Sequence, residues 1–186
     1  VANGGHFVSR HNNQIVFVRH AITGEIANVK ITAINSKFAF GDAVEILKSS
    51  KDRVVAPCKY SHPDGCGGCD FQHINPIAQS SFKKIVIQDQ FKRITKIEVN
   101  PEFISNDTSD GLNWRSRLNL AVSKNKNLGL HAHRSNKIVE VDECLIALKE
   151  INDSDIFDKK WNNEDNLKIS YSSENDFNIY QSGINL

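Results

Sequence analysis

The chain has 186 residues, of which 39% are hydrophobic and 24% are charged. This is an ordinary globular balance, and the length allows one medium domain or two small ones. The formal net charge is +1, with no long run of one sign. Such a charge argues against a nucleic-acid binder held by bulk positive charge, although it leaves room for a shaped RNA site with a few placed cations.

The sequence contains no membrane or export signal. No stretch approaches the ~18 consecutive apolar residues of a membrane helix, and no basic segment followed by an apolar one opens the chain. We therefore expect a cytoplasmic protein with no membrane partner. Because the chain starts at Val1 and contains no methionine, we also expect it to be a fragment or a processed chain.

The first fifty residues read as short strands. Asn12-Asn13 tolerates positive φ and predicts a hairpin turn. The predicted strands are residues 6–10, 14–19, 26–34 and 38–47, the last broken at Gly41-Asp42. Four strands joined by tight turns predict an OB-like β-barrel over residues 1–50.

The remaining residues, 51–186, predict an α+β domain. A polar link at 49–52 leads into a loop over 57–73 that is rich in Cys, Gly and Pro. Pro76 suits the first turn of a helix, and apolar residues follow it at helical spacing up to Ile94. Further predicted elements are strands at 115–123, 129–133 and 137–141, a helix at 145–157, and a hairpin of 168–171 with 177–180.

Four cysteines form the main candidate for chemistry. Cys58, Cys66 and Cys69 lie in the loop, and Cys144 lies far downstream. Cys66 and Cys69 are spaced C-x2-C with two glycines between them, which lets two thiolates reach one metal centre. Disulfides need an oxidising compartment, for which no signal is present. Four unrelated buried thiols would rarely show this spacing, so from the residues alone an iron–sulfur cluster and a four-cysteine zinc site both remain open.

The motifs, taken in chain order, resemble the bacterial RNA uracil-C5 methyltransferase family. The segments that carry the resemblance are Gly4-Gly5-His6, 14–21 and Gly24-Glu25, then 52–58 and Cys66-Gly67-Gly68-Cys69-Asp70-Phe71-Gln72-His73, then Trp114-Arg115-Ser116-Arg117, 129–135 and 138–144. Together they span about residues 4–146. The resemblance implies an N-terminal TRAM domain with an OB-type barrel, followed by a domain that holds a [4Fe–4S] cluster through Cys58, Cys66, Cys69 and Cys144.

The resemblance also implies a part that this sequence does not contain. The family's S-adenosylmethionine-binding, Rossmann-like domain carries a Gly-rich turn, a cysteine nucleophile and an acidic base. No G-x-G loop after a strand occurs here, and every cysteine is assigned to the cluster. Because uracil C5 needs a thiolate to add at C6 before it accepts a methyl group, we expect the chain alone to be inactive and assign it no catalytic residue.

RNA, either ribosomal or transfer RNA, is the expected partner. Arg115 and Arg117 are two residues apart on a predicted strand and share one face, where they either bind RNA or form surface ion pairs. His133 and Arg134 have the same two interpretations. In the barrel, the basic candidates are Arg19, Lys30 and Lys37, while Phe7, Phe17, Phe38 and Phe40 are read as core in preference to stacking platforms.

One alternative function belongs to a different class. A free-standing RNA-binding module with a structural four-cysteine zinc site would carry the same cysteines and the same basic residues. Iron or zinc content separates the two hypotheses. We expect a monomer, and the sequence does not select between ribosomal and transfer RNA or indicate which uridine is the target.

Overall fold

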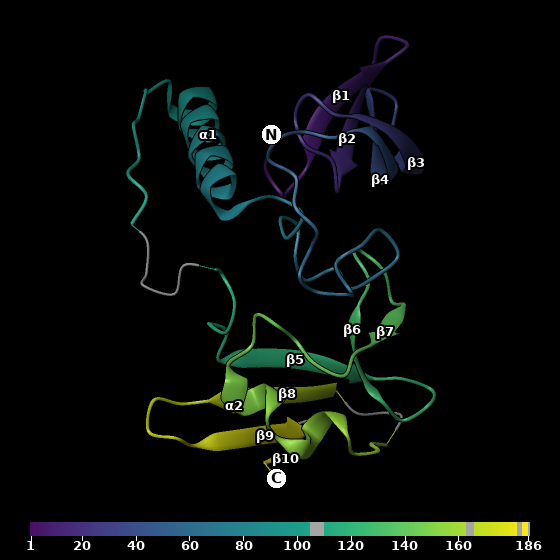
Figure 1. Ribbon diagram of the computed structural model, residues 1–186, viewed down its shortest axis with the longest axis vertical. Coiled ribbons are helices and arrows are strands. Elements are labelled where there is room, and N and C mark those ends of the chain that lie inside the picture. Colours follow the sequence, from purple (N-terminus) through teal and green to yellow (C-terminus); the bar gives the residue numbers. More distant parts are fainter. Residues whose placement is uncertain (105–109, 163–165, 182–183, 186) are drawn as a thin grey trace. The chain divides into compact units, whose positions relative to one another are not determined.

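The structure is a computed structural model that describes residues 1–104, 110–162, 166–181 and 184–185, with the side chains of 181, 184 and 185 left aside (Figure 1). The chain divides into two compact units. The first comprises residues 1–63 and 69–106, and the second comprises residues 64–68 and 107–186. The first unit therefore extends past the predicted domain end at residue 50 and takes in most of the cysteine loop and the helix that follows.

The first unit contains a four-stranded sheet in the order β1-β2-β4-β3. Its strands are β1 (Phe7–His11), β2 (Gln14–Arg19), β3 (Ile26–Ile34) and β4 (Phe38–Lys48). The hairpin predicted at Asn12-Asn13 is confirmed, because both residues have positive φ, 47° and 64°, and β1 pairs antiparallel with β2 around them. All four predicted strands are present at close to their expected bounds.

One feature of this sheet differs from the sequence-based picture, and another stays untested. β4 runs unbroken through Gly41-Asp42, where a break had been expected. A Cβ on Gly41 would lie 2.6 Å from the Val29 side chain and 2.9 Å from the Lys30 carbonyl oxygen, so glycine here allows the close approach of β3. β1 and β3 are the two ends of the strand order, and no pairing between them is recorded among the described residues. Closure into a barrel therefore stays a prediction.

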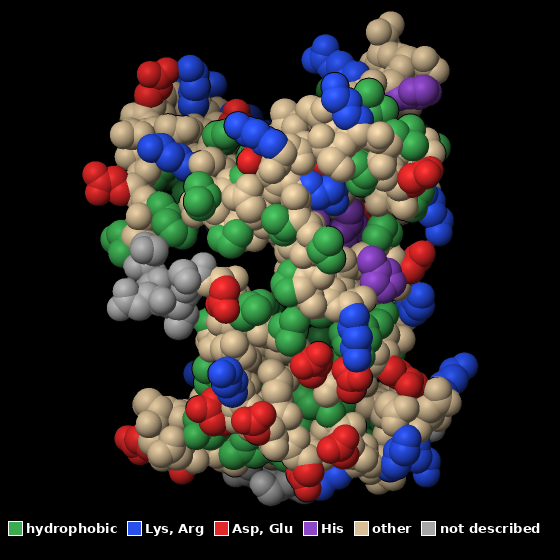
Figure 2. Space-filling view, in the orientation of Figure 1, with side chains coloured by type: hydrophobic (Ala, Val, Ile, Leu, Met, Phe, Trp, Pro, Cys, Tyr) green, Lys and Arg blue, Asp and Glu red, His purple; other side chains and the backbone are tan. Residues whose placement is uncertain are grey.

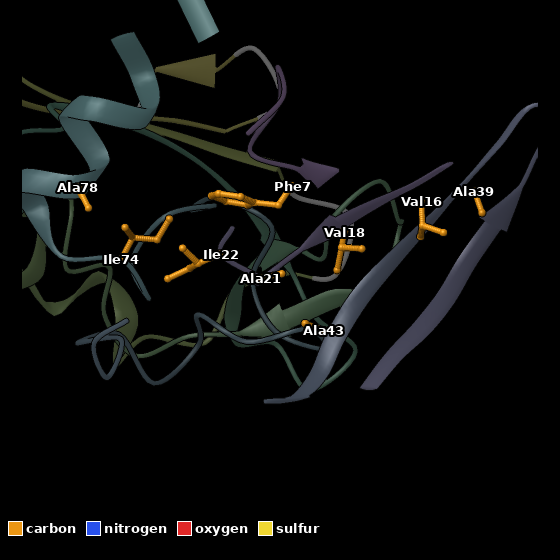
Figure 3. Close-up of a cluster of buried hydrophobic side chains, with 9 residues drawn as sticks. All are labelled: Phe7, Val16, Val18, Ala21, Ile22, Ala39, Ala43, Ile74 and Ala78. Carbon is orange, nitrogen blue, oxygen red and sulfur yellow. The ribbon is translucent and has the colours of Figure 1, made fainter. Parts of the chain in front are cut away.

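The core of the first unit joins the sheet to the start of the helix (Figure 3). Phe7 and Val18 are buried together with Ile74, which lies just before the helix, and Ala78, which lies in its first turn. Phe7 also meets Phe82 edge-on, with ring centroids 5.2 Å apart. The interpretation of Phe7 as core is confirmed. Phe17, Phe38 and Phe40 instead pack against one another, because their register places them on the opposite face from Val18.

The helix α1 (Pro76–Thr95) begins where the sequence predicts it. Asn75 caps it by accepting a 2.8 Å hydrogen bond from the Ala78 N–H, and Pro76 fills the first turn, where a missing N–H costs nothing. Lys96, in the left-handed region, ends it. Much of its apolar surface is exposed, and Figure 2 shows hydrophobic side chains at the surface over this helix.

The second unit contains a six-stranded sheet in the order β10-β9-β8-β5-β6-β7. Its strands are β5 (Arg117–Val122), β6 (Leu128–His131), β7 (Ile138–Glu140), β8 (Asn166–Tyr171), β9 (Phe177–Gln181) and β10 (Ile184–Asn185). Alternation over the first residues of β5 and β8 buries Leu118, Leu120, Leu167 and Ile169 on one face. The predicted hairpin of β8 with β9 is confirmed.

The single helix predicted over residues 145–157 is wrong. The structure has only a short α2 (Lys149–Asn152) and a 3₁₀ turn, η1 (Asp155–Phe157). Leu148 and Ser154 are extended, with ψ near 150°, and so interrupt the helix at both places. The apolar residues that suggested a helix, Ile151 and Ile156, are buried from these short turns instead.

Candidate functional site

The four cysteines are divided between the two units. Cys58 and Cys69 belong to the first unit and are partly buried. Cys66 and Cys144 belong to the second unit, where Cys144 is buried with 8% of its surface exposed. Because the C-x2-C segment itself is split, with residue 66 in one unit and residue 69 in the other, the loop joins the two units through its own backbone.

The first unit fixes the entrance to the cysteine loop through one buried carboxylate. Glu25, whose side chain is 1% exposed, accepts hydrogen bonds from Arg53 Nε and Nη2, both at 2.6 Å. It also accepts the N–H groups of Ile22 at 2.8 Å and Ser50 at 3.0 Å. Arg53 Nη2 donates further to the His20 carbonyl oxygen at 2.7 Å. This network ties the residues just before Cys58 to the sheet.

The pKa of Glu25 agrees with its role as the anion that holds Arg53. Burial by itself raises the pKa of the carboxyl, but the hydrogen bonds from Arg53, Ser50 and Ile22 outweigh it and hold the pKa below its usual value. Glu25 is therefore ionised at neutral pH. Arg53 supplies two parallel N–H donors, the geometry in which guanidinium and carboxylate bind most strongly.

Within the second unit, Cys66 is held against the residue that directly follows β6. Cys66 forms an isolated bridge with Ala132, and the Gly67 N–H donates to the His131 carbonyl oxygen at 3.0 Å. A Cβ on Gly67 would lie 2.6 Å from the His133 nitrogen, so the contact requires glycine. The Gly68 N–H donates to Cys66 Sγ at 3.3 Å, the kind of bond that stabilises a thiolate.

Cys144 is fixed by a side-chain clamp from α2. Asn152 Oδ1 accepts the Cys144 N–H at 2.9 Å, and Asn152 Nδ2 donates to the Cys144 carbonyl oxygen at 3.0 Å. The Ala147 N–H donates to the same carbonyl at 2.8 Å. With both backbone groups satisfied, the thiol of Cys144 is presented from a defined turn.

The donor chemistry of these residues fits an iron–sulfur or zinc centre, because thiolates are the ligands that both prefer. No group of three or more His, Cys, Asp or Glu side chains placed to hold a metal ion is found in the described ranges. Two thiols lie in each unit. The prediction that all four meet one centre therefore stays a prediction, supported by the N–H donor at Cys66.

A pair of buried histidines beside the loop was missed by sequence reasoning. The rings of His20 and His73 lie 5.8 Å apart, and both residues are at most 7% exposed. His73 contacts the Ala21 carbonyl oxygen through Nε2 at 3.2 Å, while His20 Nε2 and His73 Nδ1 have no recorded hydrogen-bond partner among the described residues. Burial, followed by the neighbouring charge of Arg19, lowers the pKa of His20 to about 4, and burial lowers the pKa of His73 as well.

The three basic candidates in the first unit have different surroundings. Arg19 is 6% exposed and donates to both carboxylate oxygens of Asp42, at 2.8 and 3.2 Å. Its guanidinium is thus committed to a buried ion pair between β2 and β4. Lys30 on β3 and Lys37 before β4 are exposed. The RNA-binding prediction remains untested for all three, but Arg19 now has a structural explanation.

The four RNA-binding candidates in the second unit also have different surroundings. Arg115 forms a parallel bridge with Ala147, and its guanidinium lies 5.2 Å from the Trp114 ring centroid. Arg117 is exposed on β5. His133 and Arg134 follow β6, where Arg134 is exposed and has φ of 48°. Arg115 precedes β5 and Arg117 begins it, so the prediction that they share one face of a strand remains untested. His133 and Arg134 belong to the turn that holds Cys66 and Gly67.

No helix in the described part of the chain has the length and apolar character needed to cross a membrane.

Comparison with known proteins gives the family. Residues 1–44 match the TRAM domain. An RNA methyltransferase of Streptomyces avermitilis is 38% identical over 176 residues, covering 87% of this chain and 40% of that protein. The 23S rRNA (uracil(1939)-C(5))-methyltransferase RlmD of Neisseria lactamica is 30% identical over 153 residues, covering 80% of this chain and 33% of that protein. This chain therefore spans about two fifths or less of these two relatives.

A solved structure shows a similar fold. The crystal structure of Pyrococcus abyssi tRNA (uracil-54, C5)-methyltransferase in complex with S-adenosyl-L-homocysteine matches 89% of this chain and 41% of its own, with a TM-score of 0.56 and 20% identity. At this identity the likeness is one of fold. With the TRAM match and the relatives together, the chain belongs to the bacterial RNA uracil-C5 methyltransferase family.

Proposed function

We propose that this chain is the N-terminal part of an S-adenosylmethionine-dependent RNA uracil-C5 methyltransferase that acts on ribosomal or transfer RNA in the cytoplasm. The observation that carries the proposal is the 38% identity over 176 residues to an RNA methyltransferase. More than half of the length of each of these relatives lies outside the matched region. In this proposal the chain, as a monomer, binds the RNA and presents the uridine.

The four cysteines hold a [4Fe–4S] cluster in this proposal. Support comes from the absence of disulfides among the four thiols, from the N–H donor at Cys66 Sγ, and from the clamped backbone of Cys144. In this proposal the cluster, with Cys144 as the remote ligand, ties distant segments of the chain together. Its contribution is structural, because methyl transfer to uracil requires no electron.

The chain's own residues have binding roles in the proposal, and the reaction itself belongs to the region outside the chain. With Cys58, Cys66, Cys69 and Cys144 engaged, no thiol remains to add at uracil C6. A stacked or paired uridine must leave its stack before an enzyme can reach it. In this proposal the cations Lys30, Lys37 and Arg117, which are exposed, bind the RNA backbone, with Arg115, His133 and Arg134 as further candidates.

The competing function is a stand-alone RNA-binding module with a four-cysteine zinc site. Four cysteine side chains suit zinc as well. Metal content distinguishes the two, since zinc gives a colourless protein and a [4Fe–4S] cluster gives a brown one.

The proposed activity is tested with the longer protein that carries this chain together with the region the relatives possess. That protein is incubated with S-adenosylmethionine and RNA from cells that lack the modification, and nucleosides are analysed by mass spectrometry. We expect 5-methyluridine from the longer protein and none from the 186-residue chain. Methylation at a position other than uracil C5, or turnover by the chain alone, would refute the proposal.

A further inference from the structure

The solvent face of the sheet in the second unit carries two adjacent rows of polar side chains. Residues directly opposite on antiparallel strands share a face, and the register joins Arg117, Ser170 and Asn178 in one row. It joins Asn119, Lys168 and Tyr180 in the next row. We call these six residues the polar sheet face. None of them is acidic, and the opposite face of the same strands is the buried core.

The charged and aromatic groups on the polar sheet face are available to a ligand. Arg117, Asn119 and Lys168 are exposed, and Tyr180 is 40% exposed. Neither Arg117 nor Lys168 takes part in an ion pair with another described residue. Unpaired cations beside an exposed aromatic ring are the combination by which proteins bind single strands.

The spacing on this face suits a single-stranded nucleic acid. Lys168 lies directly across from Tyr180, which puts their Cβ atoms about 5 Å apart. Arg117 lies diagonally from Lys168, at about 7–8 Å. A base stacked on Tyr180 would thus have a cation beside its own phosphate and a second cation one step further. The amides of Asn119 and Asn178 are both donors and acceptors, as recognition of base edges requires.

A pocket lies at the Arg117 end of this face. Its volume is about 640 Å³, and it is lined by Arg117 together with the hydroxyl-bearing residues Ser116, Ser170 and Ser173. This size is within the range of about 300–1,000 Å³ typical of small-ligand sites. Glu150 also lines the pocket, and its carboxylate opposes an anion there. A phosphate near Arg117 would therefore bind more tightly if Glu150 were neutral.

We propose that the polar sheet face is a binding platform for single-stranded RNA, with Tyr180 stacking on a base and Lys168 and Arg117 contacting successive phosphates. This inference deepens the proposed function, on which it rests, by naming where the RNA strand lies. The net charge of +1 agrees with it, because binding then depends on a few placed cations and one stacking ring, with little contribution from bulk charge.

The test uses the 186-residue chain and a fluorescein-labelled 12-nucleotide oligouridine, followed by fluorescence anisotropy at several salt concentrations. Tyr180→Leu should weaken binding about fivefold or more, and Tyr180→Phe should not, because stacking needs the ring. Arg117→Gln and Lys168→Gln should each weaken binding several-fold and reduce the slope of log affinity against log salt by about 0.7. Glu150→Gln should strengthen binding. Lys124→Gln, an exposed lysine in the β5–β6 turn, serves as the matched control.

The outcomes separate the two proposals. If the wild-type chain binds the RNA and the Arg117, Lys168 and Tyr180 variants bind equally well, the platform is wrong and RNA binding lies elsewhere. If the wild-type chain binds no RNA at all, the platform and the RNA-binding role proposed for the chain both fail. Ultraviolet crosslinking followed by mass spectrometry provides a second measurement, with the crosslink expected on the peptide that contains Tyr180; a crosslink confined to the first unit would overturn the platform.

Discussion

The buried carboxylate of Glu25 makes the strongest single prediction about this fold. Glu25→Gln keeps the shape of the side chain but removes the charge that Arg53 faces at 2.6 Å through both Nε and Nη2. Removing one member of a buried ion pair leaves the other charge uncompensated, which costs about 3–5 kcal/mol. For a chain of this size each kcal/mol lowers the melting temperature by about 2–4 °C, so we expect a fall of roughly 10 °C.

The assay is thermal unfolding followed by circular dichroism, with urea unfolding to confirm the change in free energy. The matched control is Glu98→Gln, because Glu98 pairs with Lys92 at 2.8 Å but both side chains are mostly exposed, at 80% and 68%. An exposed pair of this kind contributes little. If Glu25→Gln and Glu98→Gln unfold at the same temperature, the reasoning that Glu25 fixes the segment before Cys58 is refuted.

Three further predictions concern the same chain. Because the pKa of His20 falls from 6.5 to about 4 on folding, its contribution to the free energy of unfolding is fully present above pH 6.5 and declines by about 3 kcal/mol as the pH falls toward 4. Urea midpoints between pH 5 and 7 should show this slope in the wild type and a shallower slope in His20→Asn. Equal slopes would contradict the prediction. Gly67→Ala, whose Cβ would lie 2.6 Å from the His133 nitrogen, should cost about 1–3 kcal/mol in urea unfolding, while Gly68→Ala, 3.4 Å from Cys66 Sγ, should cost little; the reverse order would sink this explanation. Asn75→Ala should lose about 1 kcal/mol of cap energy and Asn75→Asp should retain most of it, as judged by thermal unfolding; identical losses would argue against the cap.

Local signals in the sequence predicted local structure well. The Asn12-Asn13 turn and the Asn75-Pro76 helix start depend on backbone preferences of the residues themselves, so they could be located without knowing the fold. The helix expected over residues 145–157 failed because its apolar spacing reflected burial of Ile151 and Ile156 from two short turns.

Long-range pairings could not be predicted in the same way. The parallel pairing of β2 with β4 places Asp42, 23 residues away, beside the guanidinium of Arg19, a contact that no local pattern indicates. His20 and His73 come together across 53 positions in the sequence, and neither has a spacing that would indicate a pair. The four cysteines were recognised from spacing and family resemblance, whereas their geometry as a set depends on how two separate units are joined.

The most direct test of the account is the metal content of the 186-residue chain purified without oxygen. We predict a brown protein with absorbance near ~400 nm and about four iron ions with acid-labile sulfide per chain. Cys58→Ser, Cys66→Ser, Cys69→Ser and Cys144→Ser should each lose or destabilise this iron, and Ser61→Ala, within the same loop, should not. A colourless protein that holds one zinc ion, or a Cys144→Ser variant with undiminished and equally stable iron, would contradict the account.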